Sequence, residues 1–362
     1  MNLDAIELFS HFGNYRIGLN FVKKISSYNL KALESKNWNF VWANEYDYSD
    51  NKQIPYNIYC KRFNSDIIVN EDLKKIDISS IPSHTLLCGS FPMSNSTYYE
   101  SLLFKKVFEI LLYKETPFLF LEASSELLKK NKKKLFSLIL KNFNELGYNV
   151  NWCSLNACEL GFAENSKRLY IFAYKDSLNY SKKFLKSSDF NNIFKKSIFY
   201  KSFKINYNSY NVNPLYYSDF GFLIDGVVYT SDIIYPLKNN KHILDFVIKR
   251  AEFYDSLNDL KNASYFMKTH YSEPIKKNDS VFSKPSNKLS FSDNIIKNIV
   301  YDYRINDSRV LTPVESEIVK TLPPNWTKGI DIENRYYVLE KSSVIGVITK
   351  IEPFLKNIIK LA

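Results

Sequence analysis

Cysteine and histidine are scarce in this sequence. Its 362 residues contain four cysteines (Cys60, Cys88, Cys153 and Cys158) and four histidines, with no CxxC motif and no spaced pair of histidines. Four scattered thiols do not make a disulfide framework, and a zinc site needs closely spaced cysteine and histidine ligands. We therefore expect a reduced, cytoplasmic protein without a metal site.

Long apolar runs are also missing. No stretch approaches the roughly 18 consecutive apolar residues that a transmembrane helix needs. The N-terminus carries Asp4 and Glu7 and lacks the basic start and apolar core of a secretory signal. Hydrophobic residues nevertheless make up 45% of the chain, which excludes a disordered or fibrous protein. These features predict a globular protein of about two domains without a membrane partner.

The charge is strongly basic. Lysine and arginine number 49 against 38 acidic residues, a net charge of +11, which suits a polyanionic partner such as DNA. Base composition is an equally good explanation, because the chain is rich in Lys, Asn, Ile, Tyr and Phe, residues with AT-rich codons. The lysine-rich run at residues 129–134 is interpreted as a solvated helix face or turn, with phosphate binding as the alternative.

Short apolar runs alternate with helix-length segments in the first half of the chain. Strands are expected at residues 5–9, 38–42, 66–69, 85–89, 118–121, 148–155 and 169–173, and helices at 102–111, 132–146 and 344–361. This alternation predicts an α/β fold with a mostly parallel sheet covered on both faces. From about residue 178 to about residue 305 the periodicity weakens, which indicates a second, irregular domain, and the pattern tightens again from Arg309 onward.

Four loops that follow predicted strands are candidates for a ligand site, because ligands of open parallel sheets bind beyond the carboxyl ends of the strands. They are residues 9–13, Glu45, residues 89–94 and Glu122. Glu45 could accept the two hydroxyls of a ribose, and burial could bring Glu122 into a useful acid–base range. The alternatives are an ordinary exposed carboxylate for Glu45 and a buried ion-pair partner of Arg168 for Glu122.

The order of these pieces resembles the DNA cytosine-5 methyltransferase family. The matching motifs are Phe9-Ser10-x-x-Gly13, Glu45, Asp72, Gly89-x-x-Pro92, Glu122, Leu146-Gly147-Tyr148, Leu155-Asn156-Ala157, Gly161 to Ile171, Lys284-Pro285-Ser286 and Arg309 to Glu315. Each motif is modest alone, but their common order over nearly the whole chain outside residues 178–280 is specific.

The resemblance implies an S-adenosylmethionine-dependent methyltransferase (Rossmann-like) sheet with a smaller, irregular target-recognition domain. It implies a catalytic domain at residues 1–178, a target-recognition domain at 179–305 and a segment at 306–362 that returns to the catalytic domain. Double-stranded DNA is the implied partner. The resemblance assigns cofactor contacts to Phe9, Ser10, Gly13, Glu45, Asp72 and Pro92, and catalytic positions to Met93, Glu122 and Arg168.

The sequence departs from the family where the chemistry begins. In the family a Cys thiolate adds to C6 of a flipped-out cytosine, which makes C5 electron-rich enough to take the methyl group. Met93 stands at the position of that Cys, and a thioether cannot become a thiolate. Ser166 replaces the first Arg of the Gln-x-Arg-x-Arg stretch, Glu164 replaces its Gln, and only Arg168 remains.

The cofactor motifs are altered as well. His11 replaces the first Gly of the nucleotide loop, where a side chain crowds the approach of a ligand, and Glu340-Lys341 stand where the family has Gly-Asn. Binding of S-adenosylmethionine is therefore expected to be weakened or lost.

Three functional hypotheses follow. The favoured one is a catalytically inactive family member that binds DNA or pairs with an active methyltransferase or restriction subunit. The alternative is an active methyltransferase with altered motifs, rescued by Cys88, Cys153 or Cys158. A scaffold that binds only protein is the third hypothesis.

Overall fold

The computed structural model describes residues 3–48, 50–63, 65–92, 97–130, 132–157, 162, 164, 166–178, 216–218, 221–224, 227–228, 247–270, 300–302 and 304–361. Met93 and Cys158, which the sequence analysis singled out, lie outside these residues, as does most of the predicted target-recognition domain. Within the described ranges, no helix is long and apolar enough to cross a membrane.

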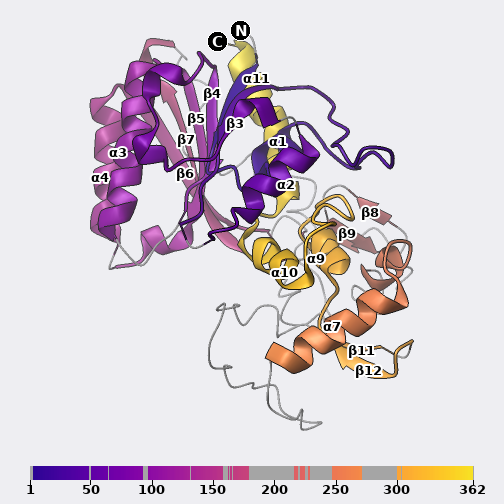
Figure 1. The fold of residues 1–362 in the computed structure, drawn as a ribbon. Helices are drawn as coiled ribbons and strands as arrows, with labels where there is room; N and C mark the ends of the chain where they lie inside the picture. Colours follow the sequence, from indigo (N-terminus) through magenta and orange to yellow (C-terminus); the bar gives the residue numbers. More distant parts are fainter. Residues whose placement is uncertain are drawn as a thin grey trace.

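Seven strands form the central sheet, in the order β3-β2-β1-β4-β5-β7-β6 (Figure 1). They are β1 (Asp4–Leu8), β2 (Asn39–Asn44), β3 (Ile68–Val69), β4 (Leu86–Ser90), β5 (Phe118–Ser124), β6 (Tyr148–Asn156) and β7 (Lys167–Lys175). The first five strands run parallel, and β7 inserts antiparallel between β5 and β6. The predicted α/β fold class and its mostly parallel sheet are confirmed.

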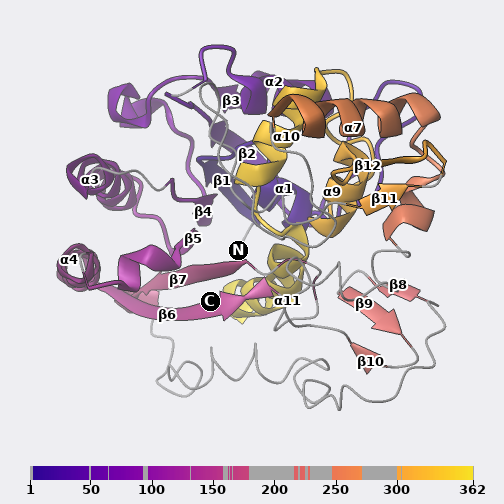
Figure 2. The same ribbon diagram turned by 90° about the horizontal axis from the view of Figure 1, so that it is seen from below.

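Helices cover both faces of the sheet (Figures 1 and 2). Helices α1 (Asn14–Leu19), α2 (Ile54–Arg62) and α11 (Ile345–Leu361) lie on one face, and α3 (Thr97–Tyr113) and α4 (Lys133–Glu145) lie on the other. The sequence of β5 is a continuous apolar run because the strand is buried on both faces. Phe118 and Phe120 pack in the core between the sheet and helices α1 and α11, whereas Leu119 and Leu121 pack in the core between the sheet and helices α3 and α4. A strand buried on both faces cannot show polar alternation.

The ends of α4 and α11 fall within a residue or two of the predicted ones, but the lysine-rich run before α4 differs from expectation. Lys132 is buried, and its Nζ lies 2.8 Å from Oε1 of Glu100 on α3. Lys129 and Lys130 are exposed, as predicted for a solvated turn. Lys132 therefore joins two helices, because a buried ammonium requires a paired carboxylate.

The C-terminal part of the chain returns to the sheet as helix α11, which packs on α1. Gly18 makes this packing possible, since a Cβ there would lie 2.6 Å from Cγ2 of Ile348. Helix α11 therefore completes the hydrophobic core on this face of the sheet.

A second group of elements lies beside the sheet (Figure 1). It contains α7 (Leu257–His270), β11 (Val300–Asp302), β12 (Asp307–Arg309), α9 (Pro313–Val319), α10 (Ile332–Lys341) and a small antiparallel sheet of β8 (Tyr216–Ser218), β9 (Gly221–Ile224) and β10 (Val227–Val228). The assignment of residues 179–305 to target recognition stays a prediction.

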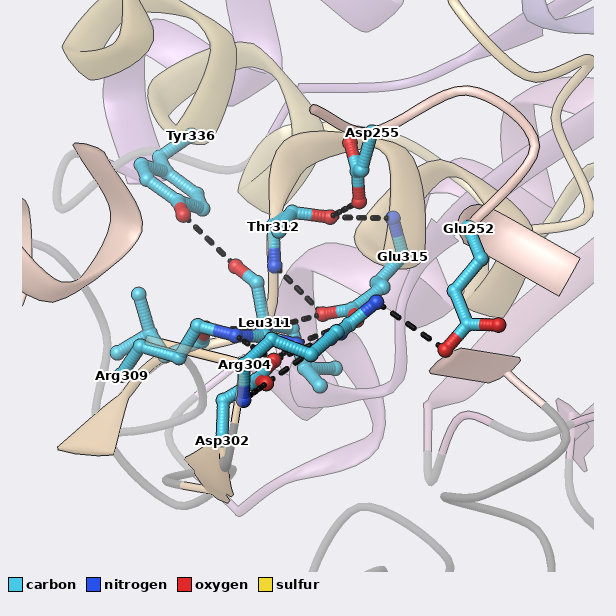
Figure 3. Close-up of polar contacts among 10 residues, drawn as sticks. Glu252, Asp255, Asp302, Arg304, Arg309, Leu311, Thr312, Glu315 and Tyr336 are labelled. Carbon is cyan, nitrogen blue, oxygen red and sulfur yellow. Dashed lines mark hydrogen bonds and ion pairs between the residues drawn. The ribbon is translucent and has the colours of Figure 1, made fainter. Parts of the chain in front are cut away.

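Arg309, at the end of β12, links β11 to the start of α9 within this group (Figure 3). Its side chain is fully buried; Nη1 and Nη2 donate to the two carboxylate oxygens of Glu315 at 2.7 and 2.8 Å, and Nε donates to Asp302 at 2.9 Å. Arg304 binds the same Asp302 from the partly exposed side. Two arginines thus neutralise two carboxylates, which a buried network of charges requires.

The same network starts helix α9. The hydroxyl of Thr312 accepts from the amide of Glu315 at 3.1 Å, and the Glu315 carboxylate accepts from the amide of Thr312 at 2.7 Å, which is a capping box. The hydroxyl of Tyr336 on α10 donates to the carbonyl of Leu311 at 2.7 Å. These bonds fix α9 and α10, and with them the α10–α11 loop that reaches the sheet.

Candidate functional site

A cleft of about 470 Å³ opens at the carboxyl ends of the parallel strands. The loops after β1, β2, β3 and β4 line it, together with the carboxyl end of β5, the start of β7 and the α10–α11 region. Six of the residues that the family resemblance singled out line this cleft: Phe9, Glu45, Asp72, Pro92, Glu122 and Arg168. Motifs that are far apart in the sequence therefore lie close together in space, because the carboxyl ends of parallel strands meet at one edge of the sheet.

The loop after β1 turns sharply. Phe9 and His11 adopt left-handed backbone conformations with φ of 51° and 53°, and Gly13 follows with φ of 93°. A Cβ on Gly13 would also lie 2.6 Å from the ring of Phe63. Ser10 of the same loop is buried, and neither Ser10 nor Gly13 lines the cleft.

Glu45 follows β2 and holds this loop. Its Oε2 accepts from the backbone amide of His11 at 2.6 Å. Burial raises the pKa of Glu45 to about 7, although this hydrogen bond acts in the opposite direction. Glu45 lines the cleft and also supports its wall.

Asp72 lies on the next loop and caps a short turn. Its Oδ1 accepts from the amide of Lys74 at 3.1 Å, and its Oδ2 lies 3.4 Å from Nζ of Lys74. The carboxylate is therefore held in place at the rim of the cleft.

Glu122 lies near the carboxyl end of β5, where it is buried and lines the cleft. The antiparallel register of β5 and β7 pairs Ser124 with Arg168, which places Nε of Arg168 3.4 Å from Oε1 of Glu122. Burial raises the pKa of Glu122, and Arg168 opposes this shift. Both the proposed acid–base position and the ion-pair alternative are thus compatible with the geometry.

Ser343 is a site residue that the sequence reasoning missed. Its hydroxyl donates to Oε1 of Glu122 at 2.9 Å and lies 3.1 Å from the hydroxyl of Ser90, while Nδ2 of Asn14 donates to it at 3.4 Å. The one sequence signal near it was the altered pair Glu340-Lys341 just before. Ser343 connects the loops after β4 and β5 with the start of α1.

The described buried cysteines do not reach the cleft. Sγ of Cys88 donates to the carbonyl of Ile6 at 3.4 Å within the sheet, and burial raises the pKa of this thiol well above its usual value. Cys153 is buried in β6, where burial likewise raises its pKa. Neither cysteine lines the cleft, so neither is placed to act as a thiolate nucleophile there.

The cleft contains polar groups that a ligand could satisfy. Among the described residues, nine buried polar side-chain atoms have no hydrogen-bond partner, and five of them belong to residues that line the cleft: Nδ1 and Nε2 of His11, Oδ1 of Asn14, Oε2 of Glu122, and Nε of Arg168, which makes only the ion pair with Glu122. Such atoms are rare in folded proteins and call for a partner. Described residues hold no cluster of three or more side chains suited to a metal ion.

The lining also fits a nucleoside cofactor. Phe9 and Phe91 offer aromatic surface, with ring centroids 5.4 Å apart, and Glu45 and Asp72 supply carboxylates for hydroxyl groups or a positive charge. The volume falls within the usual range for small-molecule sites, about 300–1,000 Å³.

The fold is shared with solved methyltransferase structures. A DNA modification methyltransferase encoded in an E. coli prophage matches with a TM-score of 0.59 and 14% identity, over 99% of this chain and 100% of that one. The S. pombe Dnmt2 methyltransferase matches with a TM-score of 0.55 and 11% identity, over 99% and 100%.

The chain belongs to the C-5 cytosine-specific DNA methylase family, whose sequence profile matches residues 3–357. It is 25% identical to the Type II methyltransferase M.Sau3AI of Staphylococcus aureus over 399 residues, which cover 96% of this chain and 94% of that enzyme. M.HhaI of Haemophilus parahaemolyticus is 23% identical over 186 residues, about half of each chain (49% and 50%). The predicted family is confirmed; it uses S-adenosylmethionine and acts on DNA.

Proposed function

We propose that this family member binds double-stranded DNA without transferring a methyl group, as a partner of an active methyltransferase or restriction subunit. The observation that carries the proposal is the residue after Pro92, which is Met93 and not Cys. Adding a thioether to C6 of cytosine would leave a charged sulfonium, whereas the family reaction needs the neutral adduct of a thiolate.

The surroundings of Glu122 support the same conclusion. Of the three polar residues in the altered Gln-x-Arg-x-Arg stretch, Arg168 lines the cleft, whereas Glu164 and Ser166 do not. Glu164 is paired with Nζ of Lys320 at 2.7 Å, and that ammonium also donates to the carbonyl of Ser342. The stretch therefore contacts the C-terminal segment and contributes one cation, not two, to the cleft.

Cofactor binding without turnover is part of the proposal. Phe9, Glu45, Asp72 and Pro92 would hold S-adenosylmethionine, and Ser10 and Gly13 would shape the loop beside it. In the reaction of the family the bound cofactor supplies the methyl group, a step that we do not expect here. Residues 1–178 and 306–362 would then form the cofactor-binding domain, and residues 179–305 would contact DNA.

The first test is methyl transfer. We expect bisulfite sequencing of DNA incubated with the pure protein and S-adenosylmethionine to reveal no protected cytosine at any site. We also expect no covalent complex on duplexes that contain 5-fluorocytosine, because an adduct requires a nucleophile. An active family enzyme, assayed in parallel, shows that the conditions allow detection.

The matched variant is Met93→Cys, which restores the thiol alone. We expect it to remain inactive, because Ser166 still replaces an arginine. Site-specific methylation by the unaltered chain, or a trapped complex with it, would instead establish the alternative, an active methyltransferase with altered motifs. The retained Glu122 and Arg168 support that alternative.

The second test is DNA binding. A protein that neutralises several phosphates releases counterions, so the logarithm of its binding constant should fall linearly with the logarithm of the salt concentration, by about 0.9 per phosphate contacted. In gel-shift or anisotropy titrations between 50 and 200 mM salt, we expect the slope of this logarithmic plot to be about −3 or steeper. A flat dependence, or no binding, would favour a scaffold that contacts only protein.

A further inference from the structure

His11 is the residue of the cleft that neither the fold nor the family chemistry explains. It follows β1, lines the cleft and is 9% exposed. Both ring nitrogens, Nδ1 and Nε2, are buried without a hydrogen-bond partner. A buried imidazole in a folded protein normally has at least one partner.

The backbone does not require this side chain. His11 has φ of 53°, a left-handed conformation that a glycine adopts more readily. The loop is held by the peptide group, since the amide of His11 donates to Glu45 at 2.6 Å, a bond that a glycine would also make. The ring contacts Phe12, with centroids 4.3 Å apart, but Phe12 is itself buried in the core.

The ring is neutral in this setting. Burial, together with the nearby positive charge of Lys341 and Lys320, lowers the pKa of His11 to about 3, although Asp47 acts in the opposite direction. A neutral imidazole carries one N–H donor and one acceptor nitrogen. His11 therefore carries a donor and an acceptor, both buried and without a hydrogen-bond partner, in a residue that lines a cleft with aromatic rings and carboxylates suited to a nucleoside.

We propose that His11 is a ligand-contacting residue specific to this chain, whose two unpaired ring nitrogens hydrogen-bond a nucleoside of the S-adenosylmethionine class in the cleft. The proposal rests on the cofactor-binding part of the proposed function and not on the loss of methyl transfer. It reverses the sequence-based expectation that His11 only crowds the ligand: the imidazole replaces, with its own hydrogen bonds, the close backbone approach that a glycine would allow.

The test uses the full-length protein and S-adenosylhomocysteine, which carries no transferable methyl group. We expect calorimetric titration to detect binding by the unaltered chain, weakened about thirtyfold in His11→Gly, the loss expected for two hydrogen bonds. His11→Phe keeps a ring without polar atoms and should lose affinity as well. His11→Asn keeps a donor and an acceptor and tolerates a left-handed backbone, so it should retain more affinity than either.

A second measurement needs no variant. In a ¹⁵N-resolved NMR spectrum of the histidine rings, S-adenosylhomocysteine should shift the His11 nitrogens. His84 is the internal control, because its Nε2 lies 2.8 Å from the Thr116 hydroxyl and its Nδ1 lies 2.9 Å from the Pro82 carbonyl. Its signals should stay in place.

Three results would overturn the inference: equal or tighter binding by His11→Gly, unchanged His11 signals on saturation, or no binding by the unaltered chain. Failure of the proposed function is distinguishable. A protein that methylates DNA, yet loses affinity in His11→Gly, would contradict the proposed loss of catalysis and support the role of His11.

Discussion

Replacing Arg309 by alanine is expected to lower the free energy of unfolding by about 3–5 kcal/mol, because removing one partner of a buried ion network leaves uncompensated charge. Asp302 and Glu315 would both lose the fully buried guanidinium that binds them at 2.7 to 2.9 Å. Urea unfolding followed by circular dichroism measures the change. The α10–α11 loop should lose its place at the cleft at the same time.

Arg304→Ala is the matched control. Arg304 binds the same Asp302, but its side chain is 32% exposed, so water can replace the lost charge. We expect a loss of less than about 1 kcal/mol, typical of solvent-exposed ion pairs. Equal effects of the two substitutions would show that Arg309 does not organise the network.

The second large effect concerns pH. Glu7 on β1 is fully buried, and its carboxylate accepts from the amides of Tyr15 at 2.7 Å and Arg16 at 3.4 Å, at the start of α1. Burial outweighs these hydrogen bonds and raises the pKa of Glu7 from 4.5 to about 8. The folded protein therefore keeps a proton that the unfolded chain releases above pH 4.5.

The sign of the pH dependence follows. The contribution of Glu7 to stability is fully present below pH 4.5 and is lost as the pH rises to about 8. Its limiting slope is about −1.4 kcal/mol per pH unit. Glu7→Gln keeps an acceptor for the amide of Tyr15 without the titrating proton. We expect denaturant unfolding from pH 5 to pH 9 to show a flatter profile for this variant, which should be the more stable protein at pH 9.

Glu45 and Asp255 have pKa values raised to about 7 and add to the slope in the unaltered protein, so the difference between the two profiles isolates Glu7. Glu126→Gln is the control, because that side chain is exposed and its pKa is lowered by Lys129. Parallel profiles for the unaltered chain and Glu7→Gln would mean that Glu7 is ionised in the folded state.

The strands were predictable because the apolar pattern of a short stretch of sequence indicates which strand faces are buried. β5 is apolar from Phe118 to Leu121 since both faces of the sheet are covered, and α4 places Phe136, Ile139 and Phe143 on one side at helical spacing. Lys132 was misjudged because its partner, Glu100, lies on another helix. Local pattern carries no information about such a pairing.

The absence of a thiol after Pro92 can be known from sequence alone, because whether a side chain can form a thiolate depends on its own atoms and not on its neighbours. The α/β fold class and the order of the family motifs could also be predicted from the sequence alone. Only the tertiary structure decided that Cys88 hydrogen-bonds within the sheet, that Ser343 binds Glu122 across 221 residues of chain, and that the ring nitrogens of His11 have no hydrogen-bond partner. Burial and hydrogen bonding between distant segments arise only once the chain has folded, and they determine what the cleft can bind.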